Sequence, residues 1–213
     1  MNNIEFFPIL QSLRLKVEDA PFSVTPEIES AVDARWQEEL LKKPLFNGQI
    51  LIVKHITESE ITVQYAQYKY LIAQSVTHVK PLAVSGITRA GEQILIGKRS
   101  QSVSSYSGYF ETVPSGSVDG VSFLDVLYKE FEEETTLSRH EIHSHKVLGL
   151  FYCTKTMVYD IGILLDVNPE IAKGSLSPTR EYEMLIWIPF KLMLKHSPMV
   201  PLSQELLEVV AKS

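Results

Sequence analysis

The chain has 213 residues, of which 45% are hydrophobic and 22% charged, an ordinary balance for a folded protein with a substantial core. Its formal net charge of −6 argues against a general binder of nucleic acids or anionic membranes. Its single cysteine, Cys153, excludes an internal disulfide, and no apolar run reaches the length of a membrane span. The N-terminus lacks the basic and apolar regions of a signal peptide, so we expect a cytoplasmic protein.

Residues 1–80 are expected to form a β-rich N-terminal module with one helix. Thr25 and Pro26 are typical of a helix start, because they supply an N-cap and a proline at the first helical position. Pro81 follows a short linker to the second module. The expected elements are a helix from Pro26 to about Lys42 and strands over 49–55 and 61–73.

Residues 81–213 are expected to form the second, larger module. Its clearest helix is predicted over 122–137, where Ser122 and Asp125 make a capping box and apolar residues recur at helical spacing. Three nearby histidines, His140, His143 and His145, are expected in a polar loop. Further on, strands are predicted over 147–154 and 159–166, a loop over 172–180 and a closing helix over 203–211.

Four glutamates gather near the end of the central helix: Glu130, Glu132, Glu133 and Glu134. The helix dipole disfavours anions at that end, and like charges three or four residues apart repel one another. Helical spacing puts Glu130, Glu133 and Glu134 on one face and turns Glu132 away into solvent. Grouped carboxylates suit a hard cation such as Mg²⁺ or Mn²⁺, so we predict a metal site; the alternative is a solvated acidic face.

The stretch from Lys129 to Leu137 and the turn Pro114-Ser115-Gly116 together resemble the signature of the Nudix hydrolases. That signature is a loop–helix–loop reading Gly-x5-Glu-x7-Arg-Glu-U-x-Glu-Glu-x-Gly-U, where U is a bulky apolar residue. The resemblance extends over 81–213, and it implies an α/β fold, an α/β/α sandwich around a mixed sheet. Its supporting strands are the stretches 83–88, 93–100, 108–114 and 181–189.

The sequence departs from the family signature at three residues. Val121 stands where the first Glu is expected and Lys129 where the Arg is expected, and the opening turn is one residue shorter than usual. Thr136 replaces the Gly that ends the helix. Because a β-branched residue adopts a left-handed C-cap poorly, we expect the chain to leave this helix in another way.

The resemblance implies metal-dependent hydrolysis of the diphosphate linkage in a nucleoside diphosphate joined to another group. The products would be a nucleoside monophosphate and a phosphorylated compound. It implies Glu130, Glu133 and Glu134 as ligands of Mg²⁺ or Mn²⁺, with the carbonyl of Ser115 as a backbone ligand.

Three further roles stay open at the level of sequence. One glutamate of the helix could activate water, or a later carboxylate, Glu181 or Glu183, could be the base. Lys98 and Arg99 are candidates for binding the substrate's phosphates, and equally they could form an ordinary solvated strand end.

The substrate predicted by the resemblance is a small nucleotide rather than a nucleic-acid polymer. The stretches 34–40 and 44–48, with 81–84 before the first hairpin, look most like the branch of UDP-sugar diphosphatases. The alternative is a catalytically inactive Nudix-fold module that binds or senses a nucleotide, which the departures at Val121 and Thr136 motivate. No membrane partner is expected, and a homodimer is compatible with the sequence.

Overall fold

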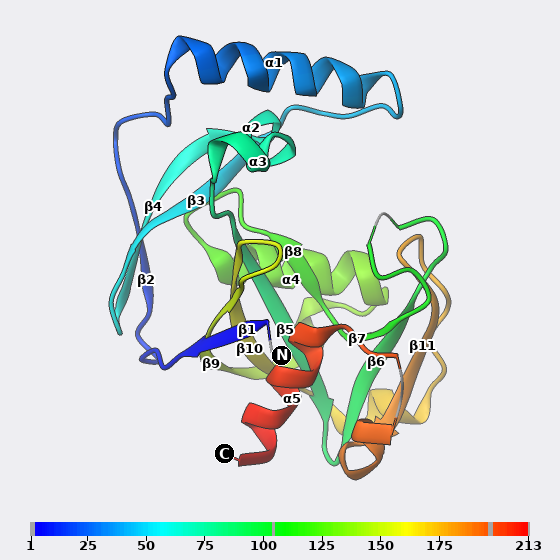
Figure 1. Ribbon diagram of the computed structural model, residues 1–213. Coiled ribbons are helices and arrows are strands. Elements are labelled where there is room, and N and C mark those ends of the chain that lie inside the picture. Colours follow the sequence, from blue (N-terminus) through cyan, green and yellow to red (C-terminus); the bar gives the residue numbers. More distant parts are fainter. Residues whose placement is uncertain (1–2, 104, 196–197, 213) are drawn as a thin grey trace.

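A mixed sheet forms the centre of the molecule (Figure 1). The computed structural model describes residues 3–103, 105–195 and 198–212. Within these residues the large sheet has the order β1-β9-β10-β5-β6-β11, with β7 beside β6 and β8 beside β5. Strands β10 and β5 run parallel, whereas β1, β9, β6 and β11 pair antiparallel with their neighbours. The strands are β1 (Ile4–Phe7), β5 (Leu82–Ala90), β6 (Gln93–Arg99), β7 (Phe110–Thr112), β8 (Ser115–Ser117), β9 (Ile142–Cys153), β10 (Val158–Val167) and β11 (Tyr182–Pro189).

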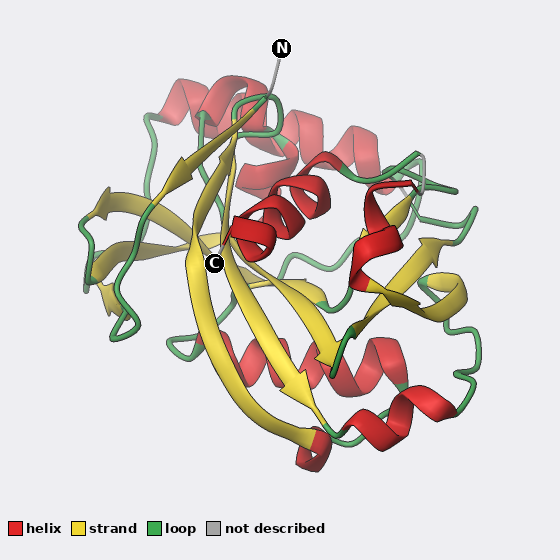
Figure 2. Ribbon diagram, turned by 90° about the horizontal axis from the view of Figure 1, so that it is seen from below, coloured by secondary structure: helices red, strands yellow, loops and turns green. Residues whose placement is uncertain are grey.

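Two helices cover opposite faces of this sheet (Figure 2). Helix α4 (Phe123–Thr135) buries Phe123, Leu127 and Phe131 in one cluster with residues of β5 and β10. Helix α5 (Pro201–Lys212) buries Leu206 and Leu207 in a second cluster against β5, β6 and β9. The two clusters lie on the two faces because neighbouring strand residues point in opposite directions. The predicted α/β/α sandwich is therefore confirmed.

A smaller sheet and three helices lie in the chain between β1 and β5 of the large sheet. Thr25 caps α1 as predicted: its hydroxyl oxygen accepts the N–H of Ile28 at 3.5 Å. The strand predicted over 61–73 is wrong beyond Gln67, where α2 begins. The reason is an amide cap from another segment, since Asn47 Oδ1 accepts the N–H of Lys69 at 2.9 Å. The elements are β2 (Arg14–Val17), α1 (Pro26–Leu40), β3 (Gln49–Ile56), β4 (Glu60–Gln67), α2 (Tyr68–Ile72) and α3 (Gln74–Thr77), with the strands in the order β2-β4-β3.

The first 80 residues share both a sheet and a core with the rest of the chain. Strand β1 pairs antiparallel with β9, and Ile52 of β3 forms an isolated bridge with Pro81. Leu51 and Ile61 lie in the same apolar cluster as the residues under α4. The division near residue 80 stays a prediction about organisation, because the packing itself is continuous across it.

The segments around β9 and β11 include short 3₁₀ turns. Strand β9 begins at Ile142, so the loop predicted for the three histidines is wrong for His143 and His145, which lie in the strand. No helix in the described part of the chain has the length and apolarity needed to span a membrane. The 3₁₀ turns are η1 (Arg139–Glu141), η2 (Pro169–Lys173) and η3 (Phe190–Lys195).

The packing of α4 predicts a large loss of stability on truncation of its central residue. Leu127 is 0% exposed, so Leu127→Ala should lower the free energy of unfolding by about 2–5 kcal/mol through lost burial and a residual cavity. The neighbouring Val121 is 61% exposed, and Val121→Ala should change it by less than about 0.5 kcal/mol. Urea titration measures both; equal losses in the two variants would contradict this view of the core.

Candidate active site

The C-terminal half of α4 carries the glutamates and packs over the short strand β8. The hydroxyl of Ser122 accepts the N–H of Asp125 at 3.2 Å, which fixes the start of the helix as predicted. Pro114-Ser115-Gly116 is predicted to be a turn, but Ser115 and Gly116 are the first two residues of β8, which pairs with β5. A Cβ on Gly116 would lie 2.6 Å from Cγ of Glu130, so a larger residue here would displace the Glu130 side chain from its present position.

The helix ends in a left-handed residue, contrary to expectation. Thr136 has φ 61°, and its N–H donates to the carbonyl of Glu132 at 3.0 Å. Side chains hold the exit in place of a glycine: Thr135 Oγ1 accepts the N–H of Leu137 at 3.1 Å. Glu132 Oε1 accepts the N–H of Arg139 at 2.9 Å. Glu132 is exposed, as predicted, but it also caps the segment that follows the helix.

Glu134 is the most unusual side chain of the site. It is only 4% exposed, and its Oε2 accepts the N–H of Ser115 at 3.1 Å and the hydroxyl of Tyr182 at 3.3 Å. Its other oxygen, Oε1, is buried and has no hydrogen-bond partner among the described residues. Burial, reinforced by Glu181 and Glu111, raises the pKa of Glu134 well above its ordinary value. A buried carboxylate oxygen without a donor fits a cation, since oxygen is the donor that Mg²⁺ and Mn²⁺ prefer.

The other two predicted ligands differ from Glu134 in their surroundings. Glu130 is half-buried, and burial followed by the charge of Glu133 raises its pKa. Glu133 is exposed and forms an ion pair with Lys129 of the same helix, with Nζ and Oε1 3.5 Å apart. Within the described residues, no three acidic, histidine or cysteine side chains stand close enough to share one ion as they lie. A shared ion would therefore require Glu133 to turn away from Lys129.

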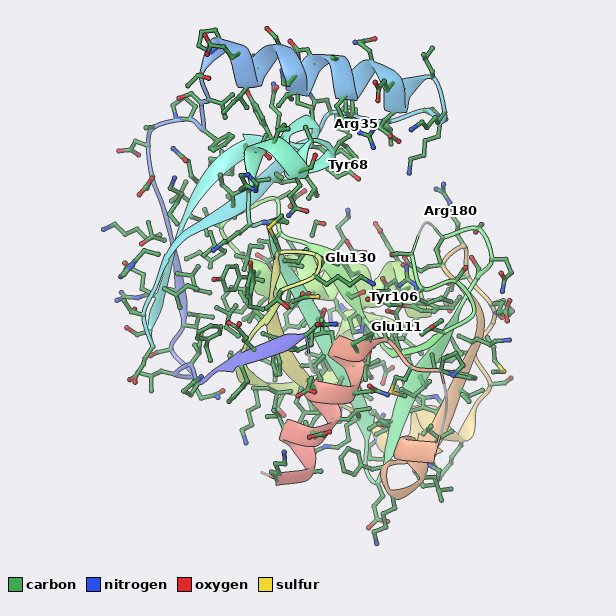
Figure 3. All side chains as sticks on the ribbon, in the orientation of Figure 1. Arg35, Tyr68, Tyr106, Glu111, Glu130 and Arg180 are labelled. Carbon is green, nitrogen blue, oxygen red and sulfur yellow. The ribbon has the colours of Figure 1, made fainter. Side chains whose placement is uncertain are left out.

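A cavity of about 500 Å³ opens between α4 and the loop before β11. Glu130, Glu133 and Glu134 line it from the helix, and Glu181 and Arg180 line it from the opposite side. Glu130 and Arg180 are marked in Figure 3. The cavity thus joins the three predicted ligands with one of the two candidate bases.

The second candidate base and one predicted phosphate ligand do not line this cavity. Glu183 and Lys98 pair with each other, with Nζ and Oε1 2.6 Å apart. A β-bulge separates them from the site: Tyr182 pairs with Arg99 and Met184 with Lys98, which leaves Glu183 as the extra residue. A bulge changes the direction in which side chains point from the strand. Glu181 therefore lines the cavity, whereas Glu183 pairs with Lys98 outside it.

Arg99 does line the cavity, but two carboxylates already hold it. Its guanidinium pairs with Glu111 and, at 3.2 Å, with Glu181, and its Nε donates to the carbonyl of Ser105 at 3.1 Å. Sequence reasoning missed Glu111, which is 6% exposed. The available signal was a glutamate inside the predicted strand 108–114. Sequence reasoning also missed Arg180, which is exposed and makes no ion pair with another described residue, so its guanidinium is free for a ligand.

A second cavity of about 270 Å³ adjoins the first one, and Arg99 and Glu181 line both. Asp160 of β10 lies in its wall, 8% exposed, and its Oδ1 accepts the hydroxyl of Ser85 at 2.9 Å. Burial raises the pKa of Asp160 from 3.8 to about 6. Nothing in the sequence distinguishes this aspartate from a solvent-facing strand residue.

Comparison with known proteins identifies the fold. No family model matches the sequence, and no curated protein matches it. The structure is similar to DR0079 from Deinococcus radiodurans, with a TM-score of 0.55 and 14% identity over 76% of this chain and 98% of that one. It is also similar to the MutT protein from Methanosarcina mazei Go1, with a TM-score of 0.51 and 17% identity over 62% of this chain and 92% of that one. The chain has the MutT fold. At these identities the likeness establishes the fold alone, and the Nudix-type fold predicted from the sequence is confirmed.

Asp160 predicts a pH dependence of stability within this MutT fold. Because its pKa rises from 3.8 to about 6 on folding, the folded state holds a proton that the unfolded state has lost between these values. Its contribution is complete below pH 3.8 and disappears as the pH rises to about 6, a difference of about 3 kcal/mol. Asp160→Asn should therefore raise the free energy of unfolding by about 2–3 kcal/mol at pH 8 and change it little at pH 4.

Urea titrations at the two pH values measure this effect. Asp19 is exposed, so Asp19→Asn serves as a control with little effect at either pH. A gain from Asp160→Asn that is the same at pH 4 and pH 8 would mean that the aspartate is not buried as an acid.

Proposed function

We propose that the protein is a metal-dependent pyrophosphohydrolase acting on a nucleoside diphosphate joined to another group. The observation that carries the proposal is the carboxylate of Glu134, buried with one oxygen lacking a donor in an acidic cavity. An ionised carboxylate left in that state costs several kcal/mol unless a cation meets it. Glu130, Glu181 and Glu111 add further negative charge around it, which favours a divalent cation over a basic side chain.

The residues around the cavity support a division of roles. A bound divalent cation supplies positive charge to the phosphoryl oxygens and lowers the pKa of a water molecule that it binds. Glu130, Glu133 and Glu134 are the proposed ligands, with the carbonyl of Ser115 as the backbone ligand. Glu181 is the proposed base, because it lines the cavity and Arg99 holds its carboxylate at 3.2 Å.

The phosphate-binding residue is assigned to Arg180 rather than to Lys98. A guanidinium offers two parallel N–H donors to a phosphate, and that of Arg180 is exposed at the cavity. Lys98 is neutralised by Glu183, and Arg99 serves mainly to orient Glu111 and Glu181. Small nucleotides are the proposed partners. A cytoplasmic location and two modules that divide near residue 80 complete the proposal.

The proposed substrate class is a UDP-sugar, which rests on the resemblance of the stretches 34–40, 44–48 and 81–84. Purified protein with Mg²⁺ and UDP-glucose should release UMP and glucose 1-phosphate in equal amounts, with one water consumed per bond cleaved. Chromatography of the nucleotides measures this. A panel that includes ADP-ribose and a nucleoside triphosphate provides the comparison, and turnover of another member without UMP release would remove the UDP-sugar assignment.

Replacement of the buried glutamate tests the chemistry independently of the substrate's identity. Glu134→Gln keeps the shape but removes the charge, and should lower kcat by roughly 10²- to 10³-fold, the scale of losing one electrostatic stabiliser in a closed site. Glu132→Gln is the matched control on the same helix, and it should leave kcat nearly unchanged because this side chain is exposed and does not line the cavity. Equal activity of the two variants would overturn the assignment.

The rival function is nucleotide binding without turnover. Two observations favour it. Glu133 is paired with Lys129, and no three acidic side chains of the described residues lie close enough together to bind one metal ion. Calorimetry with UDP-glucose in the presence of Mg²⁺ separates the two functions: heat of binding without release of product supports the binding module, whereas product release supports the enzyme.

A further inference from the structure

We propose that Tyr182 is a positioning residue: its hydroxyl holds Oε2 of Glu134 and thereby turns Oε1 toward the cation. The inference rests on the metal site of the proposed function and extends it to a residue that touches neither substrate nor metal. It follows from how the tyrosine ring is fixed, what its hydroxyl contacts, and which oxygen of Glu134 is left free.

The ring of Tyr182 cannot move away from the site. It is 0% exposed and packs in a cluster with Leu95, Val113 and Leu185. On its other side it lies against the backbone of Gly97, where an added Cβ would come within 2.6 Å of Cε1 and 2.9 Å of Cγ. A ring enclosed in this way presents its hydroxyl at one fixed point.

The β-bulge in β11 directs the ring to this face of the sheet. In a regular strand, Tyr182 and Leu185 would point to opposite faces, because they are three residues apart. Glu183 is an extra residue in the pairing with β6, so Tyr182 and Leu185 instead lie in the same buried cluster. The bulge therefore places this hydroxyl beside the two carboxylates. Bulges next to functional sites often redirect a side chain in this way.

The hydroxyl lies between two buried carboxylates. Its distance to Glu111 Oε1 is 2.8 Å and to Glu134 Oε2 is 3.3 Å, and it has only one proton to donate. Glu111 already has the guanidinium of Arg99, so it does not depend on the tyrosine for a partner. Glu134 has no cation among the described residues, and its Oε2 relies on Tyr182 and the N–H of Ser115. The shorter contact is the one to Glu111, but Arg99 also holds that carboxylate, so the proposal assigns the proton of Tyr182 to Glu134.

These two donors fix the rotation of the Glu134 carboxylate. Both act on Oε2, and Oε1 is buried without a partner. A carboxylate held through one oxygen offers the other as a single, oriented ligand, which is how neighbouring hydrogen bonds commonly prepare a metal ligand. Loss of the hydroxyl would leave the N–H of Ser115 as the only donor to Glu134 from the described residues, and the carboxylate could rotate about its terminal bond.

Tyr182→Phe tests the inference because it removes the hydroxyl, keeps the ring and leaves the charge of the site unchanged. Titration of Mn²⁺ into the metal-free protein, followed by calorimetry or by the electron spin resonance of free Mn²⁺, should show affinity lowered about 10- to 100-fold. Tyr70→Phe is the matched control: this buried hydroxyl also donates to a glutamate, Glu29, at 2.8 Å, but in the N-terminal segment. It should leave Mn²⁺ affinity unchanged while losing a hydrogen bond of the same kind.

The outcomes separate this inference from the proposed function. If the wild type binds Mn²⁺ and Tyr182→Phe binds it equally well, the positioning role is overturned and the metal site stands. If the wild type binds no Mn²⁺, with or without nucleotide, both are overturned. Should the variant not fold, a crystal structure of the wild type with Mn²⁺ decides: the tyrosine hydroxyl must remain hydrogen-bonded to Oε2 of Glu134 with Oε1 on the ion, and any other arrangement overturns the role.

Discussion

The candidate site depends on one contact, the hydrogen bond of 3.1 Å from the Ser115 amide to the carboxylate of Glu134. It joins β8 to the last turn of α4 and holds a carboxylate that is only 4% exposed at the wall of the cavity. Burial of such a group is unfavourable by several kcal/mol, so other interactions have to hold the helix in place. The apolar stripe of Phe123, Leu127 and Phe131 does so, because its burial against β5 and β10 leaves the helix no other orientation.

The hydrogen bond from Ser115 does not neutralise the negative charge of Glu134, and further acidic residues surround it. Arg99 pairs with Glu111 of β7 and with Glu181 of the loop before β11. Glu134 has no basic partner among the described residues. Tyr182 links the two halves of this arrangement by contacting both Glu111 and Glu134. The result is a surplus of negative charge at Oε1 of Glu134, a buried oxygen without a donor in the described part of the chain. Such a surplus is the electrostatic condition for a cation site.

The N-terminal segment contributes to the same structure. Strand β1 extends the large sheet beyond β9, and Leu51 and Ile61 continue the core that lies under α4. A linear reading of the sequence treats this segment as a separate module because its pattern of strands is complete without the rest. Pairing between β1 and β9 joins residues about 150 positions apart, and no local pattern carries that information.

The sequence by itself determined the elements whose cause is local. The capping box at Ser122, the apolar stripe of α4 and the spacing of Glu130, Glu133 and Glu134 all act within a few residues, so the helix and its acidic face could be predicted. The fold class could be predicted from the resemblance of the chain to a family signature. Only the tertiary structure decided which acids share the cavity. Glu181 and Glu183 look equivalent in the chain, and a bulge in β11 separates them. The tertiary structure likewise decided the left-handed conformation with which Thr136 ends α4, and the positions of Glu111, Tyr182 and Arg180. Contacts between distant strands and loops fix these positions, and such contacts outweigh the local preference of any one residue.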